Sequence, residues 1–175
     1  SSVEDLLKGI KDLAPIYFVT GNHELTSLAA TQYQELLALF QKYGVTDLDN
    51  DSVKLKKGGQ SITLYGRQYF SQYLTDSLPI ASDKDFDILL YHGSDNFKEI
   101  APYHYDLILS GHAHGGIVRL PIWGGIFGND GTFFPEYAGG EYTIGDATLI
   151  SSRGLGDASI PRFNNPPELV VIKLN

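Results

Sequence analysis

Three apolar segments of the sequence each end in side chains that bind metals or transfer protons. Segment 16–20 runs into Asn22, His23 and Glu24, segment 86–91 into His92, and segment 105–110 into His112 and His114. Imidazole nitrogens and amide or carboxylate oxygens are ligands of Mn, Fe and Zn, and histidine also transfers protons near neutral pH. Because the sequence has no cysteine, thiolate ligands are excluded. These residue types indicate a metal site with an acid–base group.

The three segments have the composition of buried β-strands. Their β-branched and aromatic residues lack polar alternation, which is typical of strands covered by helices on both faces. Ligands of open α/β sheets bind beyond the carboxyl ends of strands, so we expect the three ends to converge on one crevice. A single histidine after a strand is more often a turn residue, and the combination carries the prediction. His104 precedes its strand and is interpreted as structural.

Other patterns place the remaining elements. Apolar residues at helical spacing predict helices from the first residues to Pro15, over 27–43 and over 94–101. A glycine pair at 58–59 predicts a hairpin of strands 52–56 and 61–65. Further strands are expected at 141–144, 147–151 and 168–174, after a long loop over 115–140 whose aromatic residues form either a substrate wall or a satellite core.

Length and charge limit the function classes. The 175 residues fit a single domain, and the formal net charge of −8 disfavours binding to nucleic-acid backbones. No apolar run is long enough to span a membrane, and no signal-peptide pattern opens the sequence.

Two short motifs give the sequence a family resemblance. Gly-Asn-His-Glu at 21–24 and Gly-His-Ala-His-Gly-Gly at 111–116, with the strand-terminal His92 between them, resemble the calcineurin-like metallophosphoesterases. The tail from Ser151 is similar to a bacterial branch of small membrane-associated or exported phosphohydrolases. The resemblance implies an α/β fold, a β-sandwich flanked by helices, that hydrolyses phosphoesters with metal-activated hydroxide at two divalent ions of Mn, Fe or Zn.

The resemblance also implies roles for individual residues. Asn22, His92 and His112 match ligands of the second metal, His114 matches a ligand of the first, His23 matches the catalytic histidine, and Glu24 is expected to orient His23. Arg153 and Arg162 are candidates for binding a substrate phosphate, although a surface salt bridge is the commoner role of an arginine.

Two motifs of the family are missing from the sequence. It contains neither Asp-x-His nor Gly-Asp-x-x-Asp, which supply most ligands of the first metal and the carboxylate that bridges both. We therefore expect residues 1–175 to be the C-terminal portion of a longer single domain without its N-terminal strands. This chain is then expected to hold at most one ion, weakly, and to show little activity. The alternative is a non-catalytic binding domain with one metal or none.

Partners and location follow from the same reasoning. The expected substrate is a small-molecule or lipid phosphoester, and the exposed sheet edges of a shortened domain favour a homo-oligomer. The chain as given is expected to be soluble, while the complete protein has a membrane anchor or an export signal if its N-terminal segment carries one.

Overall fold

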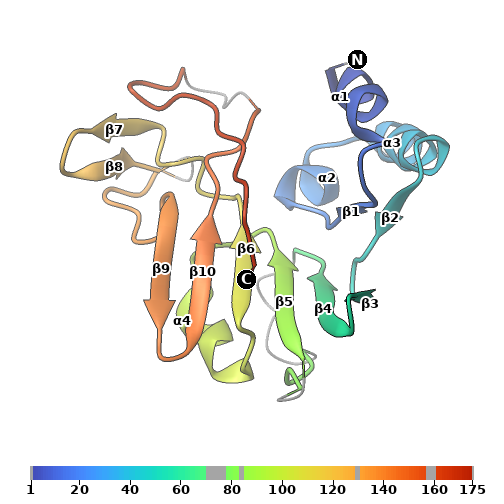
Figure 1. Ribbon diagram of the computed structural model, residues 1–175. Helices are drawn as coiled ribbons and strands as arrows, with labels where there is room; N and C mark the ends of the chain where they lie inside the picture. Colours follow the sequence, from blue (N-terminus) through green and yellow to red (C-terminus); the bar gives the residue numbers. More distant parts are fainter. Residues whose placement is uncertain (1, 70–77, 83–84, 129–130, 157–160, 175) are drawn as a thin grey trace.

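The computed structural model describes residues 2–69, 78–82, 85–128, 131–156 and 161–174 (Figure 1). Its helices are α1 (Ser2–Ile10), α2 (Asn22–Thr26), α3 (Ala30–Lys42), α4 (Phe97–Ile100) and the 3-10 helix η3 (Ala101–Tyr103). Its strands are β1 (Ile16–Phe18), β2 (Val45–Asp47), β3 (Ser52–Lys57), β4 (Gln60–Arg67), β5 (Phe86–Tyr91), β6 (Leu107–Ser110), β7 (Val118–Leu120), β8 (Gly124–Phe127), β9 (Gly140–Ile144) and β10 (Ala147–Ser151). Across these described ranges, every helix is too short or too polar to cross a bilayer.

A six-stranded mixed sheet forms the centre of the molecule. Its strand order is β3-β4-β5-β6-β10-β9, with β4, β5, β6 and β10 parallel and the two outer strands antiparallel to their neighbours. The predicted α/β class is confirmed, as are the hairpin of β3 and β4 and the strands β5 and β6. Because β5 and β6 are parallel neighbours, their carboxyl ends lie at the same edge of the sheet (Figure 1).

The two faces of this sheet bury different sets of side chains. On one face Leu89 and Ile108 pack with Phe97 and Ile100 of α4. On the other face Leu48, Leu64, Ile88 and Leu107 pack against Tyr17 and Val19 from the segment around β1. Alternation along each strand sends successive side chains to opposite faces, which explains the continuous apolar runs of β5 and β6. The second cluster joins the N-terminal part of the chain to the sheet.

The strand β1 differs from its sequence-based expectation. It pairs only with β2, in parallel, and all three of its residues are half-buried rather than buried on both faces. This two-stranded sheet lies beside the helices α1 to α3 and apart from the six-stranded sheet (Figure 1). The expected helix over 27–43 is α3, and the shorter α2 precedes it. The mixed α/β fold is present, whereas the β-sandwich stays an expectation. In the described residues, the sheet of β1 and β2 has two strands and is separate from the six-stranded sheet.

Two expectations for the C-terminal half were wrong. The segment 115–140 is not one continuous loop, because it contains the antiparallel hairpin of β7 and β8. The segment 168–174 contains the apolar run 169–172, but it forms no strand. Its side chains Leu169 and Val171 are 76% and 86% exposed. A strand requires a hydrogen-bonded neighbour, and an apolar run alone does not supply one.

Candidate metal and phosphoester site

The ends of β5 and β6 bring His92 and His112 together. The backbone N–H groups of Gly111 and His112 donate to the carbonyl oxygen of His92, over 3.2 and 2.9 Å. The two imidazole rings lie 5.1 Å apart between centroids in an edge-to-face arrangement. The Ser110 hydroxyl donates to the Tyr91 carbonyl over 2.7 Å and ties the two strand ends together. Strand pairing therefore fixes the relative position of the two histidines.

Asn22 reaches the same place from the first turn of α2. Its Oδ1 lies 3.0 Å from Nε2 of His92, across 70 residues of sequence. This is hydrogen-bond distance, so an imidazole nitrogen and an amide oxygen meet directly. Gly21 permits this approach, because a Cβ at that position would lie 3.0 Å from the His92 ring and 3.0 Å from Glu24 Oε2. Asn22 and His92 thus lie in direct contact at this edge of the sheet.

A half-buried carboxylate, that of Asp49, anchors the chain just before Asn22. Asp49 accepts hydrogen bonds from the Thr20 backbone N–H, over 2.9 Å, and from the Thr20 hydroxyl, over 2.6 Å. Thr20 is fully buried, and burial raises the pKa of Asp49 despite these two bonds. The anchor joins the end of β1 to the segment after β2, so it holds the turn that presents Asn22.

Burial sets the charge of the imidazoles. It lowers the pKa of His92 from 6.5 to about 4, with smaller contributions from the charges of His112, His114 and His23. The pKa of His114 is lowered too, first by burial and then by the nearby Arg162 guanidinium. His92 is therefore neutral at pH 7, and neutral imidazole is the form that binds a metal.

His23 and Glu24 make different contacts from those expected. Glu24 Oε2 accepts a hydrogen bond from the Gly21 backbone N–H over 2.8 Å and so caps the start of α2. His23 is exposed, and its Nδ1 lies 3.2 Å from the hydroxyl oxygen of Ser27. The contacts found for the described residues thus pair His23 with Ser27, and they give Glu24 a backbone-capping role.

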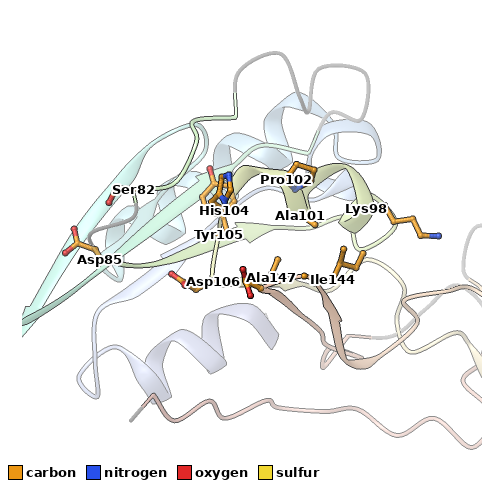
Figure 2. A pocket seen from close by; sticks show the side chains of 12 residues that line it. Ser82, Asp85, Lys98, Ala101, Pro102, His104, Tyr105, Asp106, Ile144 and Ala147 are labelled. Carbon is orange, nitrogen blue, oxygen red and sulfur yellow. The ribbon is translucent and has the colours of Figure 1, made fainter.

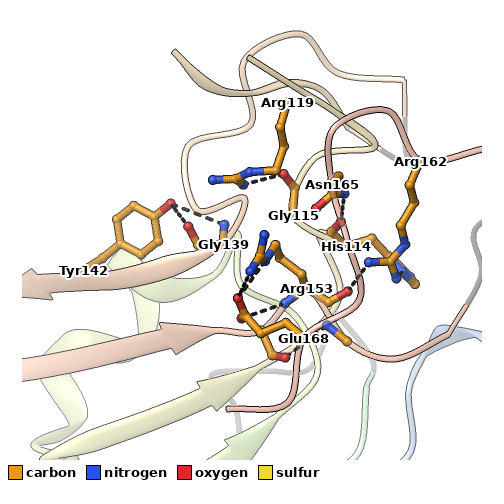
Figure 3. A network of polar contacts seen from close by, with 11 residues as sticks. His114, Gly115, Arg119, Gly139, Tyr142, Arg153, Arg162, Asn165 and Glu168 are labelled. Atoms are coloured by element: carbon orange, nitrogen blue, oxygen red, sulfur yellow. Dashed lines mark hydrogen bonds and ion pairs between the residues drawn. The ribbon is translucent and has the colours of Figure 1, made fainter. Parts of the chain in front are cut away.

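His114 belongs to a separate polar network (Figure 3). Its Nδ1 lies 3.3 Å from the guanidinium of Arg162, which also donates to the carbonyl oxygen of Arg153 over 2.8 Å. Arg153 forms an ion pair with Glu168, its Nε donating over 2.6 Å. Both arginines predicted to bind phosphate are thus engaged by protein groups. Arg162 is the one that faces a candidate ligand.

Two neighbours of these histidines were missed by sequence reasoning. The Tyr69 ring lies 5.5 Å from the ring of His92 and 5.3 Å from that of His112. The buried Asn165 donates from Nδ2 to the His114 carbonyl oxygen over 2.7 Å. Tyr69 comes two residues after β4, the parallel neighbour of β5, so the rule that found His92 would also have found Tyr69.

The chemical types of these side chains suit one transition-metal ion, but they do not suit a centre with two metal ions. An amide oxygen and imidazole nitrogens suit Mn, Fe or Zn, whereas a two-metal centre also needs a bridging carboxylate. Within the described ranges, no group of three or more His, Asp or Glu side chains is close enough to hold an ion. Asn22, His92 and His112 therefore form an incomplete ligand set.

A cavity of about 540 Å³ lies elsewhere, at the amino-terminal ends of β5 and β6 (Figure 2). It is lined in part by His104, Asp106 and Asp146. Two further charged residues of its wall are already paired, Asp85 with Lys54 and Lys98 with Glu136. This cavity is at the opposite end of the parallel strands from His92, so it does not contribute to the candidate site.

Comparison with known proteins identifies the family. The family model described as calcineurin-like phosphoesterase matches residues 1–116, which include Asn22, His92, His112 and His114. The chain therefore belongs to the calcineurin-like phosphoesterase family.

Three relatives illustrate the range of the family. The uncharacterized metallophosphoesterase YkuE of Bacillus subtilis is 38% identical over 94 residues, 53% of this chain and 32% of that protein. The phosphodiesterase YaeI of Escherichia coli is 25% identical over 175 residues, which are 99% of this chain and 63% of that protein. The UDP-2,3-diacylglucosamine pyrophosphatase LpxG of Chlamydia trachomatis is 33% identical over 94 residues, which are 49% of this chain and 28% of that protein. The chain thus spans less than two thirds of each of these relatives.

Proposed function

We propose that this chain provides part of the catalytic centre of a metal-dependent phosphoester hydrolase. Family membership supports the reaction class. The observation that carries the proposal is the approach of Asn22 Oδ1 to His92 Nε2, 3.0 Å apart, beside the ring of His112. This contact supports the proposal because side chains of ligand type from separate segments come close together there, although nothing in their local sequences requires it.

Each residue has a distinct part in this proposal. Asn22, His92 and His112 hold one divalent ion of Mn, Fe or Zn. A bound ion would neutralise charge on the phosphoryl group and lower the pKa of a water, so that hydroxide is available as the nucleophile. The exposed His23 gives a proton to the departing oxygen, and Glu24 fixes the turn from which His23 projects. His114 and Arg162 lie together and bind either a second ion or the substrate phosphate.

The proposal includes a low activity for the 175 residues alone. Three ligands without a carboxylate hold at most one ion, weakly, whereas the proposed complete single domain carries Asp-x-His and Gly-Asp-x-x-Asp and holds two. Two ions clamp both the attacking and the leaving oxygen, which one ion does not achieve.

The test compares the 175-residue chain with a longer form that carries both motifs. Hydrolysis of p-nitrophenyl phosphate and of its bis ester is followed with added Mn²⁺. We expect turnover from the longer form and close to none from the short one. In the longer form His92→Ala should reduce turnover by more than the roughly 10–100-fold typical of losing a residue that only orients a metal ligand. His104→Asn, at the opposite end of β6, serves as the matched control and should retain turnover. Equal turnover by the two forms would refute the proposal.

A second candidate function is a non-catalytic domain that binds one metal or none. It is favoured by the 3.0 Å hydrogen-bond distance between His92 Nε2 and Asn22 Oδ1, because a direct contact between these side chains requires no ion. The same variants separate the two functions, because a binding domain shows no turnover in either form while His92→Ala still weakens any metal binding.

Substrate and location extend the proposal. The relatives named a phosphodiesterase and a UDP-diacylglucosamine pyrophosphatase support a small-molecule or lipid phosphoester as substrate. The net charge of −8 disfavours a nucleic acid. We also propose self-association of the short chain through its sheet edges, and a membrane anchor or an export signal in the complete protein. Light scattering and cell fractionation test these two points.

A further inference from the structure

The tip of the β7–β8 hairpin exposes large apolar side chains. Ile122 is 103% exposed, Trp123 70% and Leu120 40%. The hairpin projects from the upper left of the molecule, away from the six-stranded sheet (Figure 1). Single exposed apolar residues are common on soluble proteins, whereas adjacent Ile and Trp side chains at the end of a projecting hairpin are not.

The tip has a defined and costly conformation. Ile122 has a φ of 74°, in the left-handed region that β-branched residues strongly avoid. The strand pairing also shifts register between Val118 and Arg119. A glycine or asparagine at position 122 would adopt this backbone at lower cost. Position 122 thus carries an isoleucine although the backbone conformation disfavours this residue and the side chain is exposed to solvent. An apolar contact made by this side chain would explain why an isoleucine stands there.

The base of the hairpin is attached to the candidate site. Arg119 donates from its guanidinium to the Gly115 carbonyl oxygen over 2.6 Å, directly after His114 (Figure 3). A Cβ on Gly116 would lie only 2.8 Å from the Cα of Gly125 in β8, so the site loop and the hairpin are in close contact. Whatever binds the tip is therefore held near the loop that carries His112 and His114.

A second exposed apolar pair lies beside β8. The Phe134 backbone N–H donates to the Ile126 carbonyl oxygen over 2.8 Å, and the Phe133 ring packs 5.3 Å from that of Phe127. Phe133 and Phe134 are nevertheless 72% and 57% exposed. The segment 120–127 contains no charged residue. The hairpin and its neighbour thus present an uncharged apolar projection.

The size of the tip argues against a protein partner. An aromatic side chain buries about 150–250 Å², so Ile122 and Trp123, with the partly exposed Phe133 and Phe134, offer on the order of 600 Å². A stable protein interface needs about 800 Å² from each partner. A small convex tip with tryptophan suits a bilayer surface, where the indole ring lies at the boundary between headgroups and acyl chains.

We propose that the tip Leu120–Trp123 inserts into the surface of a lipid bilayer and holds the candidate site against it. The inference deepens the proposed function, on which it rests, by naming phosphoesters embedded in a lipid surface as the substrate class. Because the chain has a net charge of −8, apolar insertion rather than attraction to anionic lipid drives the contact. Binding to zwitterionic vesicles is therefore insensitive to salt, and anionic lipid weakens it.

The sequence supplies its own reporter for this contact. Trp123 is the only tryptophan, so intrinsic tryptophan emission reports on the tip alone. With phosphatidylcholine vesicles we expect a blue shift of the emission, quenching by brominated lipid, and co-sedimentation of the chain. The variant Ile122→Asn relieves the left-handed strain and removes the apolar side chain, so it should fold and bind vesicles at least tenfold more weakly.

The matched control is Leu169→Asn, which removes an apolar side chain of similar exposure in the C-terminal segment. It should bind vesicles as the wild type does. Equal binding by Ile122→Asn and wild type overturns the inference, as does a blue shift that grows with protein concentration without lipid, since a second copy then covers the tip. His92→Ala should still bind vesicles. Vesicle binding without hydrolysis by the longer form contradicts the proposed function and leaves the surface contact standing.

Discussion

The half-buried His92 makes the stability of the chain depend on pH in a predictable direction. Burial lowers the pKa of His92 from 6.5 to about 4, so the folded chain binds fewer protons than the unfolded chain between these two values. The stabilisation is complete above pH 6.5 and is lost as the pH falls toward 4. At about 1.4 kcal/mol per pH unit, the loss amounts to about 3 kcal/mol.

Urea unfolding at pH 7, 6, 5 and 4, with a chelator present, measures this loss. The variant His92→Gln has no group at position 92 that titrates in this range. The difference in the free energy of unfolding between the variant and the wild type should therefore change by about 3 kcal/mol between pH 7 and pH 4. Burial raises the pKa of Asp49 and of Asp87, which lowers stability as the pH rises through their titration. Both carboxyls are present in both proteins and cancel in the difference. Parallel stability curves for the two proteins would refute the half-buried, neutral state of His92.

Three further substitutions test the packing around the site. Gly66→Ala should cost more than about 3 kcal/mol by urea unfolding, because the new Cβ would lie 2.1 Å from the Leu48 carbonyl oxygen; a loss below about 1 kcal/mol would contradict that contact. Ile108→Ala, at a fully buried position, should cost about 2–5 kcal/mol, visible as a lower melting temperature in calorimetry, and an unchanged melting temperature would place Ile108 outside the core. Thr20→Val removes the hydroxyl that donates to Asp49 and should cost about 1–2 kcal/mol, with Thr20→Ser as the control that keeps the bond; equal losses in the two variants would count against the anchor.

The central strands were predictable because their signals are local. Short stretches of sequence were enough to predict β5 and β6, from their apolar runs, and the hairpin of β3 and β4, from its glycine turn. The structure contains all four strands. The meeting of His92 and His112 followed from one further rule, that parallel neighbours end at the same edge of a sheet. Sequence reasoning therefore succeeded where element type and strand order were both constrained.

Other features depended on partners that the sequence does not name. The segment 168–174 has the apolar run of a buried strand, but it has no strand partner in the part of the chain that the structure describes. The glycines and aromatic residues of β7 and β8 imitate a loop, and only their mutual pairing makes them strands. Glu24 was expected beside His23, yet the free N–H of Gly21 at the start of α2 takes its carboxylate. In each case a tertiary contact or a capping contact decided the outcome.

The most direct test of the central claim is a Co²⁺ titration of the chain, followed by visible absorption. Asn22, His92 and His112 are claimed to share one ion, so the wild type should bind at most one Co²⁺ per chain, weakly, and Asn22→Ala, His92→Ala and His112→Ala should each lose the absorption bands. His104→Asn should keep them. Unchanged bands in all three site variants would contradict the account, because the ion would then be held elsewhere.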